Sequence, residues 1–381
     1  MIHNKDKLDY IGIALMILTS GTYIWYQRLS PALSCVIFLL FSIFYKYKIK
    51  KPLYRSGFLY VLMIFFLLLI SFLFKGDLYD NQVYGFAFMC FSSFLFISNI
   101  DFESFRQKYL YLVTLLCIYS LPIFLVYENF PNILSIDTSH GYLSCMGVTI
   151  GWEQPFERFS SIFHEPGACQ ISLNTALILY LDKIRNWDLN RKEKCSILII
   201  ILSLLATQST SGYIVLAVLA FICLEKKITS KWSVFVIPIM IIVSLLIFRS
   251  SVIQNKLFNE EKDSKSLVVR TSDNIAMIQM IQEEPLFGYG LGTNRHLKRS
   301  EALGNFTNSN GWLYITSSLG VIWLILFLLY NFRGMQRLGY QRLVLLGVFV
   351  SFLIMQGVER FAEYPISYIF IYLQRNKTKL I

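Results

Sequence analysis

Apolar runs about as long as a bilayer is thick recur along the whole chain of 381 residues. A helix that crosses the hydrocarbon core needs about 20 mostly apolar residues. Backbone polar groups in lipid must bond within their own segment, and the runs do not alternate as barrel strands do, so we expect helices. The expected helices span 9–27, 29–46, 57–74, 81–99, 109–127, 167–182, 195–208, 211–225, 233–249, 311–331, 343–358 and 362–374. The expected fold class is therefore all-α: a single polytopic membrane domain over residues 1–381 with about 12 transmembrane helices.

Charge is distributed as in a multi-pass membrane protein. The net charge is +11, yet only 15% of the residues are charged and 55% are hydrophobic. Lys and Arg gather in every second connection between the apolar runs, and therefore on one side of the membrane. Examples are Lys46–Lys51, Arg106 with Lys108, and Arg191–Lys194. The side rich in Lys and Arg should be cytoplasmic, which places both termini in the cytoplasm. No basic face is interleaved with stacking aromatics, so we expect no nucleic-acid partner.

Two connections are long, and both fall on the expected outer side. The first large outer loop covers 128–166 and the second covers 250–310. The expected spans contain almost no ionisable residues, whereas ion-coupled carriers keep such residues at mid-membrane depth. No inverted duplication of the kind found in many transporters is visible. Both observations direct the search for chemistry to the outer loops.

The seven cysteines show no pattern of a metal or redox site. None forms a CxxC pair, and most lie in or beside apolar runs, where Cys behaves as a small hydrophobic residue. Cys145 and Cys169 bracket the first outer loop, so a disulfide between them remains an alternative. No cluster has metal-ligand spacing, and we expect neither a metal nor a cofactor. The first apolar run lacks a convincing cleavage site and is interpreted as a membrane anchor.

Charged residues precede a spanning helix in the first outer loop. Arg158 and the run His164-Glu165-Pro166 lead directly into that helix, and Pro suits the first helical turn. A helix N-terminus with an arginine beside it favours phosphate. Glu165 is a candidate general base, and His164 is a candidate to assist it. The alternative is a helix cap with interfacial charges and no chemistry.

The second outer loop contains an expected amphipathic surface helix over 266–284. Its apolar face would carry Leu267, Ile275, Ile278 and Ile281. Arg270 and Asp273 lie within one turn of each other and share a side of that helix. The alternative is an interfacial helix without a site.

Three glycines follow this helix. The run Gly288-Tyr289-Gly290-Leu291-Gly292 is expected to allow backbone N–H groups to approach a ligand closely. A basic cluster then contains Arg295, His296, Lys298 and Arg299, which suits an anionic lipid head group or a sugar pyrophosphate. A flexible turn followed by a solvated loop is the alternative.

These stretches together resemble the O-antigen polymerase and O-antigen ligase superfamily of bacterial envelope glycosyltransferases. The stretches that carry the resemblance are Arg158 with Phe163–Gly167, Thr207–Gly212, Arg270 with the helix that follows it, Pro285–Gly290, and Asn308–Leu313 with Gly320. Pro285-Leu286-Phe287-Gly288-Tyr289-Gly290 behind an Arg-led helix is the most specific of them. The resemblance extends over most of the chain and implies a protein of the bacterial cytoplasmic membrane.

The resemblance implies a glycosyl transfer that uses neither a metal nor a nucleotide sugar. The implied donor is a glycan on a polyprenyl pyrophosphate, and membrane lipids surround the site. Arg158 and Arg270 match the positions of the superfamily's functional arginines, so they are expected to hold the pyrophosphate. Gly288, Tyr289, Gly290, Arg295 and Asn310 are expected to contact the substrate. A chain-length regulator and a flippase are candidate partners.

One position separates the two activities of the superfamily. Ligases usually carry a His directly before the Asn that opens the late helix, and here that position is Ser309, before Asn310. This favours a polymerase over a ligase. Eight residues separate Arg158 from Gly167 and seventeen separate Arg270 from Gly288, which departs from the spacing of polymerase loops. A lipid-linked oligosaccharide flippase and a membrane scaffold are the alternatives from other classes.

Overall fold

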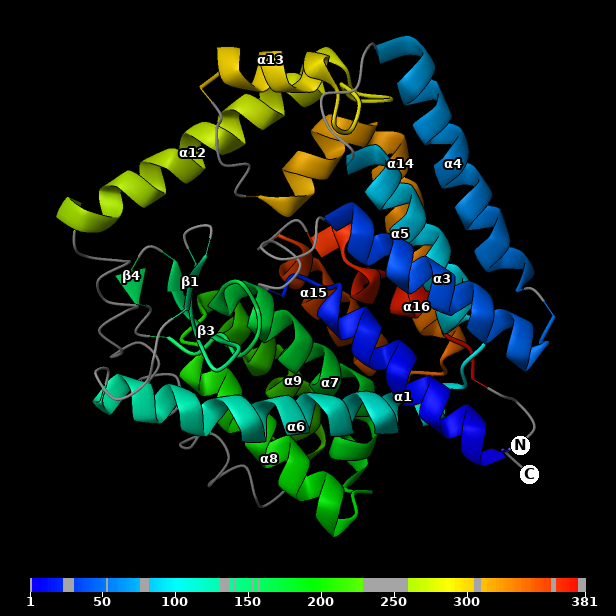
Figure 1. Cartoon of the computed structure of the whole chain (residues 1–381), viewed down its shortest axis with the longest axis vertical. Helices are drawn as coiled ribbons and strands as arrows, with labels where there is room; N and C mark the ends of the chain where they lie inside the picture. Colours follow the sequence, from blue (N-terminus) through cyan, green and yellow to red (C-terminus); the bar gives the residue numbers. More distant parts are fainter. Residues whose placement is uncertain are drawn as a thin grey trace.

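The chain is described here from a computed structural model, and its architecture is predominantly helical (Figure 1). The described residues are 2–22, 31–52, 54–75, 82–130, 137–139, 142–152, 154–155, 158–228, 260–304, 310–357 and 361–375. The helices are α1 Ile2–Leu18, α3 Pro31–Ile49, α4 Arg55–Lys75, α5 Gln82–Ile97, α6 Phe102–Asn129, α7 Pro166–Asn186, α8 Arg191–Ala206, α9 Thr210–Ile228, α12 Glu260–Glu283, α13 Asn294–Ala302, α14 Gly311–Arg337, α15 Arg342–Gln356 and α16 Ile369–Tyr372. Two 3₁₀ turns, η1 Phe361–Glu363 and η2 Pro365–Tyr368, precede α16.

Most expected helices are present, with shifted ends. The first helix begins at Ile2 rather than at residue 9, and the expected helix over 233–249 lies outside the described residues. The expected spanning helix over 362–374 is wrong, because that range contains the two 3₁₀ turns and the four-residue α16. Tyr368 and Tyr372 within it are fully buried in the protein. Irregular backbone is tolerated at such a place because protein, and not lipid, surrounds it.

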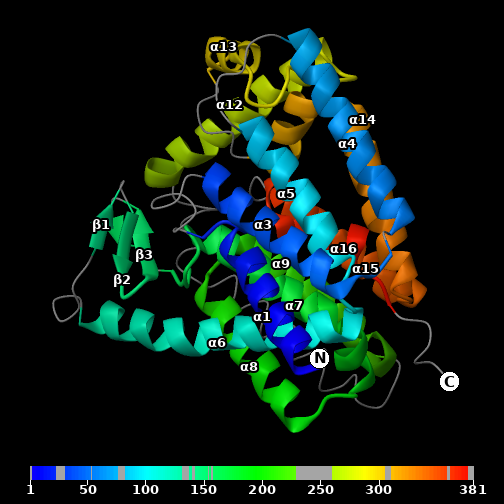
Figure 2. The same cartoon turned by 45° about the vertical axis from the view of Figure 1, so that its right-hand side comes forward.

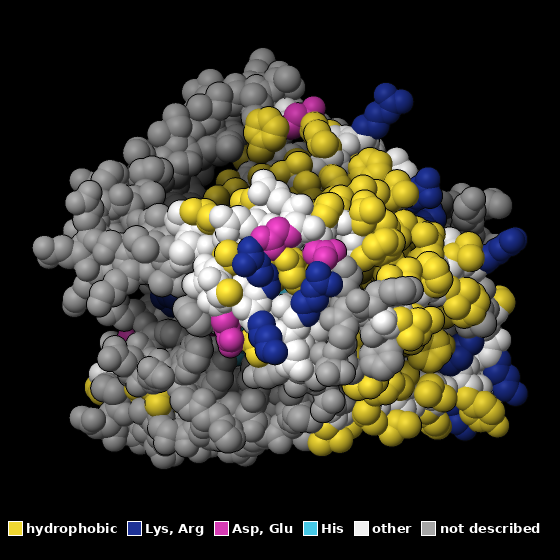
Figure 3. Space-filling view, turned by 90° about the horizontal axis from the view of Figure 1, so that it is seen from above, with side chains coloured by type: hydrophobic (Ala, Val, Ile, Leu, Met, Phe, Trp, Pro, Cys, Tyr) yellow, Lys and Arg dark blue, Asp and Glu magenta, His cyan; other side chains and the backbone are white. Residues whose placement is uncertain are grey.

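Two of the described helices, α6 and α14, are long and apolar enough to cross a bilayer. Four shorter apolar helices lie in Arg55–Ser71, Gln82–Ile97, Thr210–Glu225 and Arg342–Gln356. The number of spans expected from the sequence remains a prediction. Large apolar side chains are exposed along α3 and α4, and Figure 3 shows a broad hydrophobic surface beside a group of charged side chains.

The segment expected to form the first outer loop contains a small antiparallel sheet, so the all-α expectation is wrong for this segment. The strands β1 Asp137–Ser139, β2 Tyr142–Cys145, β3 Val148–Trp152 and β4 Gln154–Pro155 pair in sequence order. Met146 and Gly147 join β2 to β3 with φ values of 50° and 80°, as a two-residue hairpin turn requires. The strands are too short, and too rich in Ser, Thr and Gly, to stand out as an apolar pattern.

Helix starts follow local capping chemistry. At α8 the side chain of Asn190 accepts from the backbone N–H of Glu193 at 2.9 Å, and the Glu193 carboxylate accepts from Asn190 N–H at 2.9 Å. This reciprocal capping box satisfies two N–H groups that the helix itself cannot bond. At α7, Pro166 occupies the first turn as expected, and Trp187 ends the helix in the left-handed conformation at φ 58°.

Basic segments that are distant in sequence meet at one end of the helix set. The contacts are Lys46 Nζ to Asn99 Oδ1 at 3.1 Å, Arg106 to Asp182 at 3.1 Å, Lys108 to Asp9 at 2.8 Å, and Arg185 to Glu225 at 2.8 Å. This grouping agrees with the alternation expected from the sequence. Helices α12 and α13 lie at one extreme of the molecule and α8 at the other, while the sheet lies beside α6 (Figures 1 and 2).

All seven cysteines are free. Cys145 packs with Tyr127 and Ile150 in a small apolar cluster beside the sheet. Cys169 is buried in the main core between the helices. The disulfide alternative is therefore not realised in this structure.

Candidate functional site

The backbone before α7 is fixed from three directions. Phe159 N–H donates to the carbonyl of Ala206 at 3.0 Å, and Ser161 accepts from Thr149 N–H at 2.7 Å. Ser161 has a φ of 53°, and its hydroxyl lies 2.9 Å from the hydroxyl of Ser120 on α6. These bonds hold the segment between α6, α8 and β3, so the charged residues on either side of it start from a rigid base.

His164 is held by the chain that follows α1. Its backbone N–H donates to the carbonyl of Gly21 at 3.1 Å, and its ring Nδ1 lies 2.7 Å from the same oxygen. A carbonyl only accepts, so Nδ1 carries a proton, and Nε2 is the acceptor in the neutral ring. The side chain is only 8% exposed. The structure therefore gives His164 a tethering role besides its expected one.

Arg158, His164 and Glu165 lie on one short segment at the N-terminus of α7. Glu165 is the N-cap residue, its side chain makes no capping bond, and its carbonyl accepts from Cys169 N–H at 3.1 Å. Both Arg158 and Glu165 are partly exposed. The expected use of Arg158 and of the α7 N-terminus for an anionic group remains a prediction.

Sequence reasoning missed a buried polar pair on α7. Asn174 Nδ2 donates to Gln170 Oε1 at 2.8 Å, and both side chains are fully buried. Gln170 Nε2 and Asn174 Oδ1 have no hydrogen-bond partner within the described part of the chain. Gly212 of α9 faces them, and a Cβ at Gly212 would lie 3.1 Å from Gln170 Cβ. The available signal was two amide side chains four residues apart in an apolar helix.

The turn after α12 is inserted into a break in α14. Tyr289 N–H donates to the carbonyl of Ser317 at 2.8 Å, and Gly290 N–H donates to that of Ser318 at 2.9 Å. These carbonyls are available because Gly320, at φ 81° and ψ 171°, interrupts the helix. The turn and the helix therefore form one unit.

Glycine is required on both sides of this junction. Gly288 has a φ of 63°, and a Cβ there would lie 2.7 Å from the carbonyl oxygen of Ser317. A Cβ on Gly320 would overlap the backbone of Leu286. Val321 N–H donates to the carbonyl of Pro285 at 2.8 Å, across the same contact. The glycines allow the close approach that their pattern predicts, but the group they approach is α14.

The expected use of these backbone N–H groups for a ligand is therefore not seen. Gly288 N–H donates to the carbonyl of Glu284 at 3.1 Å, so all three amides of Gly288, Tyr289 and Gly290 are bonded within the protein.

Asn310, another expected substrate contact, forms hydrogen bonds that cap a helix. Its side-chain oxygen accepts from Trp312 N–H at 3.1 Å and from Leu313 N–H at 3.3 Å, which caps α14. Helix capping explains an Asn at this position without a substrate.

His296 on α13 is buried against α14, so it does not belong to an exposed basic cluster. Its Nε2 lies 3.2 Å from the hydroxyl of Ser317 and 3.1 Å from that of Ser318. Both hydroxyls are also 2.9 Å or less from the carbonyl of Tyr314, to which they donate. A protonated Nε2 that donates to the hydroxyl oxygens satisfies the whole set. The ring also meets Tyr314 edge to face, with the centroids 5.6 Å apart.

Charged pairs cover the outer surface of this unit. Arg299 forms a two-point ion pair with Glu283, with Nε 2.9 Å from Oε2. The Tyr289 hydroxyl donates to the same carboxylate. These hydrogen bonds, from Arg299 first and Tyr289 second, lower the pKa of Glu283 below its ordinary value of 4.5. Arg295 pairs with Glu284, and its guanidinium carbon lies 5.1 Å from the centre of the Tyr289 ring.

Helix α12 has two apolar faces. Ala276, Met277 and Met280 are buried, and the helix packs on α14. Ile275 and Ile278 are 53% and 44% exposed, as expected for a face turned to the membrane. The side chains of Leu267 and Arg270 lie outside the described residues, so the expected role of Arg270 remains a prediction.

An apolar pocket of about 410 Å³ lies between this exposed face and α14. Its lining consists of Ile278, Ile281, Gln282, Trp312, Leu313, Thr316, Val321, Leu324, Leu328 and Leu353. Trp312 fixes one wall, because its Nε1 donates to the carbonyl of Leu353 on α15 at 2.9 Å. Val321 also lines the pocket, and its N–H is bonded to Pro285, so the pocket borders the turn. The apolar lining is suited to a hydrocarbon chain.

A comparison with known protein families matches the region that contains the turn after α12 and the break in α14. Residues 195–328 match the family model Wzy_C, described as O-Antigen ligase. This part of the chain is similar to the O-antigen polymerase and ligase superfamily, as the sequence motifs predicted. The searches of curated proteins and of solved structures found no match.

The match covers helices α8 and α9, the turn after α12, α13 and most of α14. The junction at Gly320 and the buried contacts of His296 with Ser317 and Ser318 therefore lie inside the matched region. The segment with Arg158, His164 and Glu165 precedes it. The match indicates a membrane protein with an activity of the O-antigen polymerase or ligase type.

Proposed function

We propose that this protein belongs to the superfamily and polymerises oligosaccharide repeat units carried on polyprenyl pyrophosphate. The product would be an O-antigen or a capsular or extracellular polysaccharide, made at the outer face of the cytoplasmic membrane. The observation that carries the proposal is the unit formed by the turn after α12 and the break in α14. Ile281 and Gln282 line the apolar pocket, and the next residues along the chain, Glu283 and Glu284, pair with Arg299 and Arg295 of α13. A lipid-linked glycan has the same order of chemistry, an apolar chain followed by a polar head.

The proposed reaction is a metal-independent glycosyl transfer. An acceptor hydroxyl attacks the anomeric carbon of the donor, a new C–O bond forms, and the C–O bond to the pyrophosphate breaks. Arg158 and Arg270 hold the pyrophosphate, whose negative charge increases as it leaves. Guanidinium groups bind the transition state more tightly than the substrate for that reason. Glu165 takes the proton of the acceptor hydroxyl, which requires it to be ionised.

The acceptor distinguishes the two activities of the superfamily. A polymerase transfers the glycan to another lipid-linked repeat unit, and a ligase transfers it to a lipid core. Ser309 occupies the position at which ligases usually carry His, which supports the polymerase. The matching family model is described as O-Antigen ligase, which keeps the ligase as the second candidate.

Deletion of the gene, followed by analysis of the surface glycan, tests the proposal. Loss of a polymerase should leave surface molecules that carry a single repeat unit and no long chains. Loss of a ligase should remove both single repeat units and long chains from the lipid core, while long chains accumulate on the polyprenyl carrier. Unchanged glycan in a clean deletion would contradict both assignments, and a flippase defect would instead leave repeat units on the inner leaflet.

A further inference from the structure

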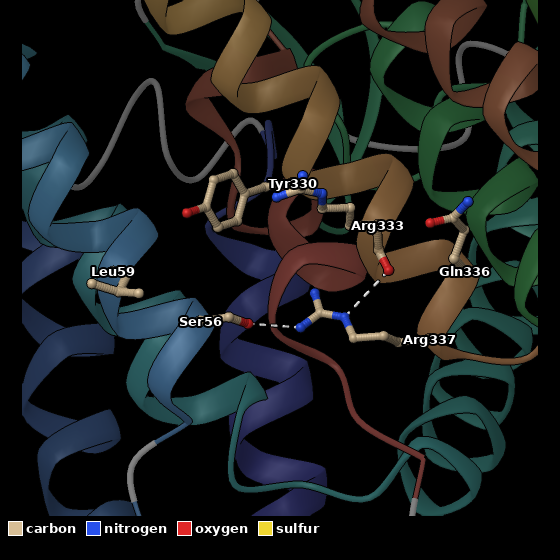
Figure 4. A pocket seen from close by; sticks show the side chains of 6 residues that line it. All are labelled: Ser56, Leu59, Tyr330, Arg333, Gln336 and Arg337. Atoms are coloured by element: carbon tan, nitrogen blue, oxygen red, sulfur yellow. Dashed lines mark hydrogen bonds between the residues drawn. The ribbon is translucent and has the colours of Figure 1, made fainter.

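A second pocket lies at the other end of α14 from the turn. It has a volume of about 530 Å³ and is lined by Ser56, Leu59, Tyr330, Arg333, Gln336 and Arg337 (Figure 4). It is formed by the first turns of α4 and the last turns of α14. This is the end at which the basic segments of the chain meet. None of the six lining residues is acidic.

Arg337 is a fixed positive charge in this pocket. Its guanidinium donates to the Ser56 hydroxyl at 2.7 Å, to the carbonyl of Arg333 at 3.2 Å and to that of Ile371 at 3.3 Å. It also lies over the ring of Tyr54 at 4.9 Å. All of these partners are neutral, so they orient the group without balancing its charge. A guanidinium has five N–H donors, so two remain for a ligand.

Arg333 adds a second positive charge beside the first. Its side chain is exposed, and within the described part of the chain neither Arg333 nor Arg337 forms an ion pair. The N-terminus of α4, which begins at Arg55, contributes further partial positive charge on the opposite wall. Two neighbouring guanidinium groups with spare donors match the oxygens of a phosphate.

An apolar stripe begins at the edge of the pocket. Leu59, Leu62, Phe66, Leu69 and Leu73 of α4 are each between 46% and 63% exposed. They are spaced three and four residues apart, so they lie on one face of the helix. At 1.5 Å per residue the stripe is about 21 Å long, which exceeds the roughly 15 Å of one leaflet of the hydrocarbon core. A hydrocarbon chain bound along this stripe would therefore remain in contact with protein through its leaflet.

We propose that this arginine pocket binds the phosphate of an anionic phospholipid, whose acyl chain lies along the apolar stripe of α4. Basic pockets between spanning helices commonly bind anionic head groups on the side where Lys and Arg gather. Tyr330 suits the boundary between head group and hydrocarbon. The inference depends on the membrane placement of α4 and α14, and it is independent of the glycan chemistry at the other end.

Native mass spectrometry of the purified protein in detergent tests this inference. The probes are phosphatidylglycerol and phosphatidylcholine with identical acyl chains, added to the wild type, to Arg333→Gln and to Arg342→Gln. Arg342 is exposed at the start of α15 and does not line the pocket. We expect the wild type and Arg342→Gln to prefer phosphatidylglycerol. We expect Arg333→Gln to bind it about tenfold more weakly, as the loss of one charge-assisted bond predicts.

Three results would overturn the inference. One is equal binding of the two lipids by the wild type, and another is an equal loss in both arginine variants, which would indicate only a diffuse charge effect. The third is displacement of phosphatidylglycerol by millimolar inorganic phosphate, which would identify a site for free phosphate. The measurement involves no glycan. The lipid-binding result is therefore unaffected if the proposed polymerase function is wrong, and the glycan experiments are unaffected if the lipid site is wrong.

Discussion

Gly320 of α14 lies directly against the backbone of Leu286, in the turn that follows α12. Its φ of 81° interrupts the helix at that point and leaves the carbonyls of Ser317 and Ser318 to accept from Tyr289 and Gly290. A spanning helix normally uses such carbonyls itself, so the break must be compensated by another segment. The turn supplies the missing donors. The turn and α14 consequently depend on each other.

Gly320→Ala should separate the turn from α14. The new Cβ meets the Leu286 backbone, and the left-handed conformation adds strain, so we expect a loss of about 1–3 kcal/mol in stability. Thermal unfolding in detergent measures it. Gly304→Ala is the matched control, because Gly304 has a φ of 73° with open space where its Cβ would lie. Equal losses in the two variants would show that strain alone acts and that the contact with Leu286 is unimportant.

The ion pair between Glu283 and Arg299 should make the attachment of α13 sensitive to acid. Hydrogen bonds from Arg299 and Tyr289 lower the pKa of Glu283 in the folded protein. A carboxyl whose folded pKa is depressed contributes stability above its unfolded pKa and loses it as the pH falls through the folded value. Glu283→Gln should therefore unfold at a lower temperature than the wild type at pH 6. The difference should shrink below pH 4.5, the ordinary value for this carboxyl. A constant difference over that range would contradict the assignment.

Asp9 should matter far more for stability than Asp6, although both pair with Lys108 at 2.8 Å. Asp9 is only 1% exposed, and it also accepts hydrogen bonds from Tyr45 and Ser104. Removal of one partner from a buried pair leaves an uncompensated charge, so Asp9→Ala should cost about 3–5 kcal/mol. The side chain of Asp6 is 57% exposed, and Asp6→Ala should cost about 0–1 kcal/mol. Similar shifts in thermal unfolding for the two variants would argue against the buried pair.

Thiol labelling tests the orientation of the helices. Met146, in the hairpin of the sheet, and Trp187, after α7, are 62% and 63% exposed, so substituted cysteines should be equally accessible to solvent. In a background that carries Cys195→Ser, because Cys195 is exposed, an impermeant reagent should label Met146→Cys in intact cells. Trp187→Cys should react only after permeabilisation. The reverse pattern would invert the topology.

The sequence predicted most of the helices because apolar runs of this length are a pattern that the bilayer imposes, whereas the resemblance to the superfamily rested on short motifs. Apolar length located α3, α4, α5, α7, α9 and α15 within a few residues. The Pro in the first turn of α7 and the amphipathic helix before Pro285 also followed from local rules. These features require no knowledge of tertiary contacts.

Features created by tertiary contact were not predicted. The sheet in the first outer loop has strands of only two to five residues, and α13 has nine residues, so neither has a clear periodic signal. The pattern of glycines at 288 and 290 correctly indicated a close approach but did not identify α14 as the partner. The pairing of His296 with Ser317 and Ser318 joins residues more than twenty positions apart, and the capping role of Asn310 competes with a binding role for the same atom.

The length of the surface glycan in a deletion strain complemented with Arg158→Ala tests the central claim most directly. Arg270→Ala is measured in parallel, and Arg191→Ala, which lies at the basic end where α8 begins, is the control. At matched expression we predict that the Arg158 and Arg270 variants produce surface molecules with single repeat units and no long chains, while Arg191→Ala restores long chains. Normal chain length in both the Arg158 and the Arg270 variants would contradict the proposal that these arginines hold the pyrophosphate during polymerisation.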